Sequence, residues 1–286
     1  RAECDVSETL DILVRDDESE TLNAFEASPK LMKKLMGDVF ATPEFIANDQ
    51  KATSLKSELI DYLPGLVRHG TYAETPSPSS DTKINWTHAT DHFVCRSSHS
   101  VDAQTFCPHL QGARDHEAQR FTELGAATVS HLQQRFHGYY SDSRLLGEMA
   151  GPALQEVVME MKEAVSDDAP STKKPFRIYS CHDVTILALL YAIEGGSVDS
   201  TQPPPQWPTY ATCLTLELVR RRKSNESDPS FVIRGWLNEA PIPAFSHSPV
   251  AFHATPDHEP SFSIDVPRFE RLVRNLNDAR VPKDLR

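Results

Sequence analysis

The most informative segment of this chain is Ile178-Tyr179-Ser180-Cys181-His182-Asp183-Val184-Thr185-Ile186-Leu187-Ala188-Leu189-Leu190. Its pattern predicts a strand over residues 176–180 and a buried helix over residues 184–193. His182 and Asp183 would then lie between the carboxyl end of a strand and the amino end of a helix. Anions bind well at such a position, because free backbone N–H groups and the helix dipole favour negative charge. The segment therefore predicts an anion-binding site that contains His182 and Asp183.

The sequence before this segment is mostly helical in pattern. Ser28-Pro29 predicts a helix start, with serine as N-cap and proline in the first turn, and Leu31, Leu35 and Val39 follow on one apolar face. Helical spacing then continues to about residue 168. Gly151-Pro152 predicts a kink or a break in the last helix of this region.

Further strands are expected on both sides of the helical region. Residues 9–14 predict a short strand, residues 212–219 and 231–237 predict two more, and residues 266–276 predict a final helix.

These elements favour a single α/β domain over residues 1–286. We expect a helical subdomain at about residues 28–168, and an α/β core built from about residues 8–20 and 174–286.

Composition excludes some classes of partner. The formal net charge of -12 disfavours nucleic acid and anionic membranes, and no apolar run is long enough to span a bilayer. Asn85 and Asn225 each start a triplet that fits N-glycosylation, and the five cysteines are too sparse for a disulfide scaffold. The compartment, the oligomeric state and any partner proteins stay open.

The segment around His182-Asp183 resembles the carboxy-terminal motif of the histidine acid phosphatases, branch 2 of the histidine phosphatase superfamily. Residues 144–157 resemble the helix that precedes that motif, and Trp207-Pro208 with residues 211–219 and 231–238 resembles the strand pair that follows it. Residues 10–29 are similar to a linker found above all in the lysophosphatidic acid phosphatase subgroup. The resemblance implies a mainly parallel mixed sheet flanked by helices, with a large helical insertion.

The resemblance also implies a chemistry. Asp183 would protonate the leaving oxygen of a phosphomonoester and then help water to attack a phosphohistidine, while His182 would bind the phosphoryl oxygens. No metal or cofactor is implied, because Arg and His side chains supply the positive charge. The substrate would be a phosphorylated small molecule of unidentified kind.

The nucleophilic histidine of the family belongs to an Arg-His-Gly-x-Arg-x-Pro motif, which we expect upstream of Arg1 together with the first strand of the sheet. Arg68-His69-Gly70 is an alternative, but it continues Thr71-Tyr72-Ala73-Glu74 and lacks the second arginine. The chain could therefore be an enzyme whose isolated 286 residues are inactive, or a degenerate member that binds phosphorylated ligands without turnover. A third reading of His182-Asp183 is a simple helix cap.

A metal site is the other alternative from sequence. His88, His92 and Cys95 lie at helical spacing, and Cys107 and His109 follow. These residue types bind zinc, yet their spacing is irregular, so ordinary histidines on a partly exposed helix are favoured.

Overall fold

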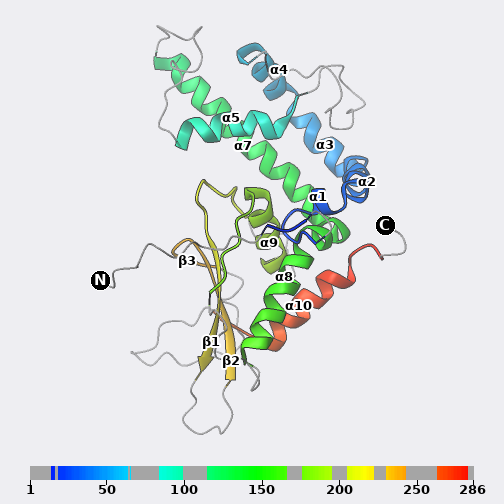
Figure 1. Ribbon diagram of the computed structural model, residues 1–286. Coiled ribbons are helices and arrows are strands. Elements are labelled where there is room, and N and C mark those ends of the chain that lie inside the picture. Colours follow the sequence, from blue (N-terminus) through cyan, green and yellow to red (C-terminus); the bar gives the residue numbers. More distant parts are fainter. Residues whose placement is uncertain are drawn as a thin grey trace.

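The computed structural model describes residues 14–16, 19–63, 65, 84–98, 115–165, 176–194, 205–221, 230–242 and 263–282 (Figure 1). The helices are α1 (Ala24–Ala27), α2 (Pro29–Phe40), α3 (Pro43–Lys51), α4 (Thr53–Tyr62), α5 (Trp86–Ser98), α7 (Asp115–Ser141), α8 (Ser143–Val165), α9 (Asp183–Glu194) and α10 (Val266–Asp278). The strands are β1 (Leu214–Arg221), β2 (Ser230–Leu237), β3 (Ala240–Pro241) and β4 (Ile264–Asp265). The described part of the chain is thus mostly helical with a small sheet.

The predicted helix start at Ser28-Pro29 is confirmed, although the Ser28 side chain makes no capping hydrogen bond. Of the predicted kink or break at Gly151-Pro152, the break is wrong, because α8 continues through Pro152. One face of α8 is buried on both sides of this proline, at Ala150 and Leu154 among others, and this packing favours a continuous helix.

The sheet differs from the expectation. β1 pairs with β2 in antiparallel register, with Leu216 opposite Gly235, and β2 also pairs with β3 and β4 in antiparallel fashion. Within the described residues the expected mainly parallel sheet is therefore wrong, since β1 and β2 follow each other directly in the chain and pair as neighbours. Residues 176–180 form no strand, and the predicted strand at residues 9–14 lies outside the described residues except for Val14.

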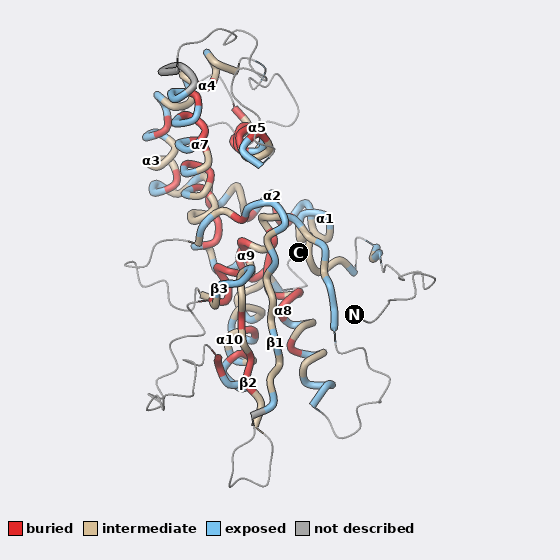
Figure 2. The backbone as a smooth tube through the Cα atoms, turned by 90° about the vertical axis from the view of Figure 1, so that its left-hand side faces the viewer, coloured by how far each residue is buried: buried red, intermediate tan, exposed pale blue. Residues whose placement is uncertain are grey.

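Two hydrophobic cores stabilise the molecule (Figure 2). The larger core joins α2, α8, α9, α10 and the sheet; its most deeply buried side chains include Met32, Leu35, Leu145, Leu154, Leu187, Ile233, Phe269 and Val273. The smaller core joins α4, α5 and α7 through Leu59, Ala89, Phe121, Leu124 and Leu132. Phe136 of α7 and Trp207 pack against both cores, so these two rings lie where the cores meet.

The carboxy-terminal helix α10 lies along α8 (Figure 1). Glu148 of α8 is buried, and its carboxylate accepts hydrogen bonds from Arg280 Nη2 at 3.1 Å and from the backbone N–H of Val281 at 3.1 Å. Among the described helices, none combines the length and the apolar character needed to cross a bilayer.

Candidate active site

His182 and Asp183 lie at the amino end of α9. The backbone carbonyl of His182 accepts hydrogen bonds from the N–H groups of Thr185 at 3.1 Å and Ile186 at 3.2 Å, which starts the helix. Asp183 is the first residue of α9, and the side chain of His182 is exposed. The chain therefore brings an exposed imidazole and a carboxylate together at the positive end of a helix dipole.

Two donors orient the Asp183 carboxylate. The indole Nε1 of Trp207 donates to Oδ2 at 3.1 Å, and the backbone N–H of Val184 donates to Oδ1 at 2.7 Å. Because each oxygen has its own donor, the carboxylate is held in one orientation beside His182.

The first turn of α9 is tied to two other parts of the chain. Thr185 Oγ1 donates to the carbonyl of Leu22 at 2.9 Å, and Tyr140 OH donates to the carbonyl of Val184 at 2.9 Å. Burial raises the pKa of Tyr140 well above its usual value, and Tyr191 and Asp183 add to that rise. Tyr140 therefore stays a neutral hydrogen-bond donor at physiological pH.

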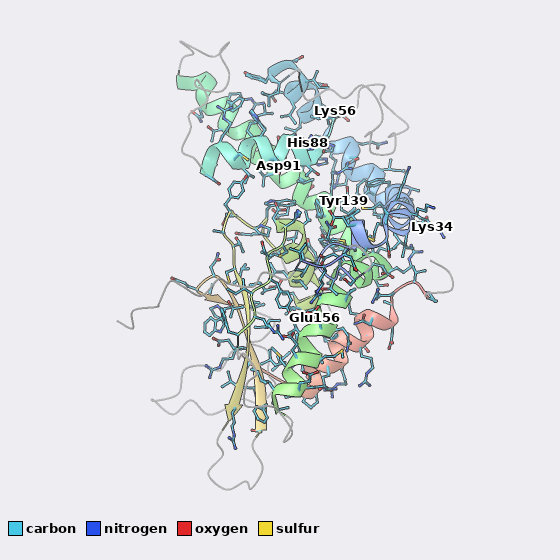
Figure 3. The ribbon with its side chains drawn as sticks, viewed as in Figure 1. Lys34, Lys56, His88, Asp91, Tyr139 and Glu156 are labelled. Atoms are coloured by element: carbon cyan, nitrogen blue, oxygen red, sulfur yellow. The ribbon has the colours of Figure 1, made fainter. Side chains whose placement is uncertain are left out.

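The segment before His182 is anchored on α8 by Glu156 (Figure 3). Its carboxylate accepts hydrogen bonds from Tyr179 OH at 3.1 Å, from Thr21 Oγ1 at 3.0 Å and from both terminal nitrogens of Arg15 at 2.5 and 2.7 Å. The hydrogen bond from Arg15 lowers the pKa of Glu156 although partial burial opposes it. The ionised Glu156 thus fixes the position of the segment that leads to His182.

The loop of residues 205–213 covers Asp183. Gln133 Nε2 of α7 donates to the carbonyl of Pro205 at 2.8 Å, and the Trp207 ring packs edge-on against Phe136 with 5.2 Å between centroids. Farther along the loop, the hydroxyl of Tyr210 is 2.7 Å from Cys95 Sγ on α5. The loop therefore connects the carboxylate of Asp183 with α5.

Asp91 lies on α5, one turn before Cys95 (Figure 3). Its side chain is exposed, yet desolvation by the surrounding protein raises its pKa, the charge of Asp183 raises it further, and His88 acts in the opposite direction. Asp91 is thus close enough to Asp183 for the two carboxylates to influence each other electrostatically.

The thiol of Cys181 lies directly before His182 but is not an activated nucleophile. Burial raises its pKa, and the negative charge of Asp183 raises it further. Both effects disfavour the thiolate, which is the nucleophilic form of cysteine.

Among the described residues, those that suggested zinc in the sequence do not form a metal-binding cluster. His92 Nε2 is 3.2 Å from Arg96 Nη1, and burial together with the charge of Arg96 lowers the pKa of His92. Within the described ranges there is no group of three or more His, Cys, Asp or Glu side chains that could hold a metal ion. Cys107 and His109 lie outside those ranges, as do Arg68-His69-Gly70 and Asn225.

Sequence reasoning proposed His182 and Asp183 as candidates but missed the residues around them. Trp207 entered only through the resemblance of Trp207-Pro208 and the following strands to the family, and nothing in the sequence links it to Asp183, 24 positions earlier. Asp91 lies between the two histidines that suggested zinc and was not singled out by sequence reasoning. Its spacing of four from Cys95 can be read from the sequence, but the contact of α5 with the loop of residues 205–213 cannot.

The comparisons with known proteins agree with the motif. The profile of the histidine phosphatase superfamily (branch 2) matches residues 21–238. Lysophosphatidic acid phosphatase type 6 of Bos taurus is 24% identical over 194 residues, which are 67% of this chain and 41% of that protein. The chain thus spans less than half of that relative's length. No solved structure matches the chain at a significant level. Since the profile covers more than half of the residues, including His182, Asp183 and Trp207, the chain belongs to branch 2 of the histidine phosphatase superfamily.

Proposed function

We propose that this protein hydrolyses phosphomonoesters through a phosphohistidine intermediate, with Asp183 as the general acid and His182 as a phosphate ligand. One observation carries the proposal: the Asp183 carboxylate stands at the amino end of α9, oriented by Trp207 Nε1 at 3.1 Å, beside an exposed imidazole. The amino end of the helix favours the phosphoryl oxygens, and the oriented carboxyl is in place to move a proton. The printed name of the Bos taurus relative adds support for a phosphatase.

The reaction has two steps. In the first, a histidine nitrogen bonds to phosphorus while the ester P–O bond breaks, and Asp183 gives its proton to the departing oxygen. In the second, water attacks phosphorus and yields a proton to the Asp183 carboxylate, while the P–N bond breaks and inorganic phosphate leaves. His182 donates a hydrogen bond to the phosphoryl oxygens as negative charge develops.

The nucleophilic histidine is, in this proposal, outside the 286 residues. Support comes from the sequence, because the one Arg-His-Gly, at residues 68–70, lacks the second arginine and the proline of the family motif. A second candidate function follows from the same observation: without a nucleophile, the site would bind a phosphorylated ligand and not turn it over.

The test compares two leaving groups. In a protein that contains the family motif, Asp183→Asn is expected to lower the rate by about two to four orders of magnitude for an alkyl phosphate and by less for an activated aryl phosphate, which needs less protonation. Circular dichroism of the variant checks that it remains folded. Equal and negligible losses on both substrates would remove Asp183 from the mechanism.

The nucleophile is tested with residues 1–286 alone. We expect no turnover of an aryl phosphate above background at acid pH, either with the unchanged chain or with His69→Ala. Robust activity that disappears in His69→Ala would instead identify His69 as the phosphoryl acceptor. Retained binding of inorganic phosphate without turnover, even when the family motif is supplied, would favour the binding function.

A further inference from the structure

Helix α5 contacts the loop of residues 205–213, and the same loop contacts Asp183 of the candidate active site. The connection runs from Asp183 through Trp207 Nε1, 3.1 Å away, along the loop to Tyr210, and from the Tyr210 hydroxyl across 2.7 Å to Cys95 Sγ. Asp91 precedes Cys95 by four residues, so both lie on the same face of the helix. The loop thus brings that face of α5 toward the carboxylate of Asp183.

The pKa shifts that follow from this geometry are consistent with the same arrangement. The charges of Asp91 and Asp183 both contribute to raising the pKa of Tyr210, after the larger effect of its hydrogen bond with Cys95. The charge of Asp183 also contributes to the raised pKa of Asp91, after desolvation. Asp91, Tyr210 and Asp183 therefore interact electrostatically, while the side chain of Asp91 remains exposed to solvent.

We propose that Asp91 selects the leaving group of the substrate, favouring monoesters of neutral, hydroxyl-bearing alcohols over monoesters whose alcohol carries a negative charge. This inference rests on the proposed function. If Asp183 protonates the ester oxygen, the alcohol must extend away from the phosphoryl group past Asp183, and α5 with Tyr210 borders that space. A carboxylate at this border repels a second anionic group and accepts a hydrogen bond from a hydroxyl.

If Asp91 did no more than stabilise α5, its replacement would give a different result. A purely structural residue would change the turnover of all substrates by the same factor when replaced. A selecting residue changes the ratio between substrates that differ only in charge, and it does so mainly through KM, because the repulsion acts already on the bound ester.

The test uses glycerol 3-phosphate and 3-phosphoglycerate, which share a three-carbon skeleton and differ by a carboxylate in the leaving group. In a protein that contains the family motif, the unchanged sequence should prefer glycerol 3-phosphate. Asp91→Asn should reduce this preference about tenfold in kcat/KM, as expected for the loss of one partly screened charge. Asp91→Glu should restore the preference, and Asp91→Lys should shift it toward 3-phosphoglycerate.

The matched control is Asp61→Asn, which removes the same charge from an exposed position on α4. It should leave the ratio unchanged.

Calorimetric binding of the two esters to the unchanged chain and to Asp91→Asn provides the same ratio as dissociation constants, so the inference does not depend on turnover.

The outcomes separate this inference from the proposed function. If Asp183→Asn abolishes turnover of the alkyl ester but Asp91→Asn leaves the ratio within about twofold of the unchanged value, well below the effect of a lost charge, the selection by Asp91 is wrong and the function stands. If Asp183→Asn is as active as the unchanged protein, the proposed function is wrong, and the selection by Asp91, which rests on it, is wrong with it. If a protein that contains the family motif neither binds nor hydrolyses either ester, both are overturned.

Discussion

The indole Nε1 of Trp207 donates a hydrogen bond to Oδ2 of Asp183 over 3.1 Å. The ring that carries this donor packs on Phe136 and contacts both hydrophobic cores, so the position of the donor is set by the packing of the whole molecule. The orientation of the candidate acid thus depends on how the helices α5 and α7 join α9. Packing of this kind restricts a functional side chain more tightly than a solvent-exposed hydrogen bond could.

Trp207→Phe, made in a protein that contains the family motif, tests this relationship. Phenylalanine keeps an aromatic ring against Phe136 but removes the indole N–H, so the fold should persist. The Asp183 carboxylate then loses its donor from Trp207 and keeps the backbone N–H of Val184. We expect kcat/KM for an alkyl phosphate to fall about tenfold, corresponding to one lost hydrogen bond to a charged group. Steady-state kinetics and thermal unfolding of the same samples measure the two effects separately.

Trp236→Phe is the matched control, because Trp236 Nε1 also donates to a carboxylate at 3.1 Å, that of Glu217 on the sheet. This variant should keep full activity. An equal loss in both variants would mean that the effect of Trp207 is on stability and not on Asp183.

The elements of this fold that follow from local sequence could be predicted. Ser28-Pro29 starts α2 as expected, and the helix after His182-Asp183 spans Asp183–Glu194, within one residue of the predicted range at each end. Such features depend on neighbours in the chain: a cap, a proline in the first turn, an apolar run. The same local reasoning identified His182 and Asp183 as a candidate pair.

What the sequence did not predict depends on contacts between distant segments. Pro152 was expected to kink or break a helix that tertiary packing keeps continuous, and the mainly parallel sheet was inferred from a resemblance and not from residues. The partnership of Trp207 with Asp183 and the approach of Asp91 each require the loop of residues 205–213 to cross from α9 to α5. No hydrophobic periodicity in the sequence predicts such a crossing, because it forms only when the two cores assemble.

A buried charged cluster between α3 and α7 is expected to make stability pH-dependent. The Asp49 carboxylate pairs with Arg135 Nη1 and lies 3.3 Å from His131 Nε2, and the side chains of Arg135 and His131 are buried. Burial alone would raise the pKa of Asp49, but the neighbouring imidazole of His131 and the charge of Arg135 outweigh it and lower that pKa. A lowered pKa in the folded state means that Asp49 contributes stability above its unfolded pKa, and this contribution is lost as the pH falls toward the folded value.

Asp49→Asn should therefore destabilise the protein by about 3 kcal/mol near neutral pH, since it leaves Arg135 buried without its counter-charge. The loss should shrink as the pH is lowered below about 4, the ordinary aspartate pKa. Urea unfolding at several pH values measures this. Glu58→Gln, which breaks an exposed ion pair with Arg120, should leave the unfolding midpoint nearly unchanged at every pH. A pH-independent loss in Asp49→Asn would contradict the assignment.

Two glycines in helices should respond in opposite directions to alanine. A Cβ on Gly147 of α8 would lie 2.7 Å from the carbonyl oxygen of Leu276 in α10, which is backbone and cannot rotate away. Gly147→Ala should therefore push the two helices apart and cost about 1–3 kcal/mol. A Cβ on Gly37 of α2 would meet no heavy atom within 4 Å, so Gly37→Ala should stabilise by about 0.5–1 kcal/mol through helix propensity. Chemical denaturation of the pair decides whether α10 is seated on α8 as closely as described.

The segment that leads to His182 is expected to control association of the chain. Its alternate side chains turn toward α8, where Arg177 pairs with Glu160 at 3.3 Å and Tyr179 bonds to Glu156 at 3.1 Å. The residues that alternate with them face away: Phe176 is 72% exposed and Ile178 is 81% exposed. This alternation is that of an extended chain, and residues 176–181 make no backbone–backbone hydrogen bond with any other described residue.

An extended segment with exposed apolar side chains and available backbone groups is prone to pair with another chain. Replacing Phe176 and Ile178 together by serine should therefore lower the sedimentation-average mass of concentrated samples toward that of a monomer, with little change in the unfolding midpoint. Phe25→Ser, at a position on α1 that is 40% exposed, supplies the control and should leave association as it was. If the double variant associates as strongly as the unchanged chain, the contact between copies lies elsewhere, and the apolar face of residues 176–180 is not what joins them.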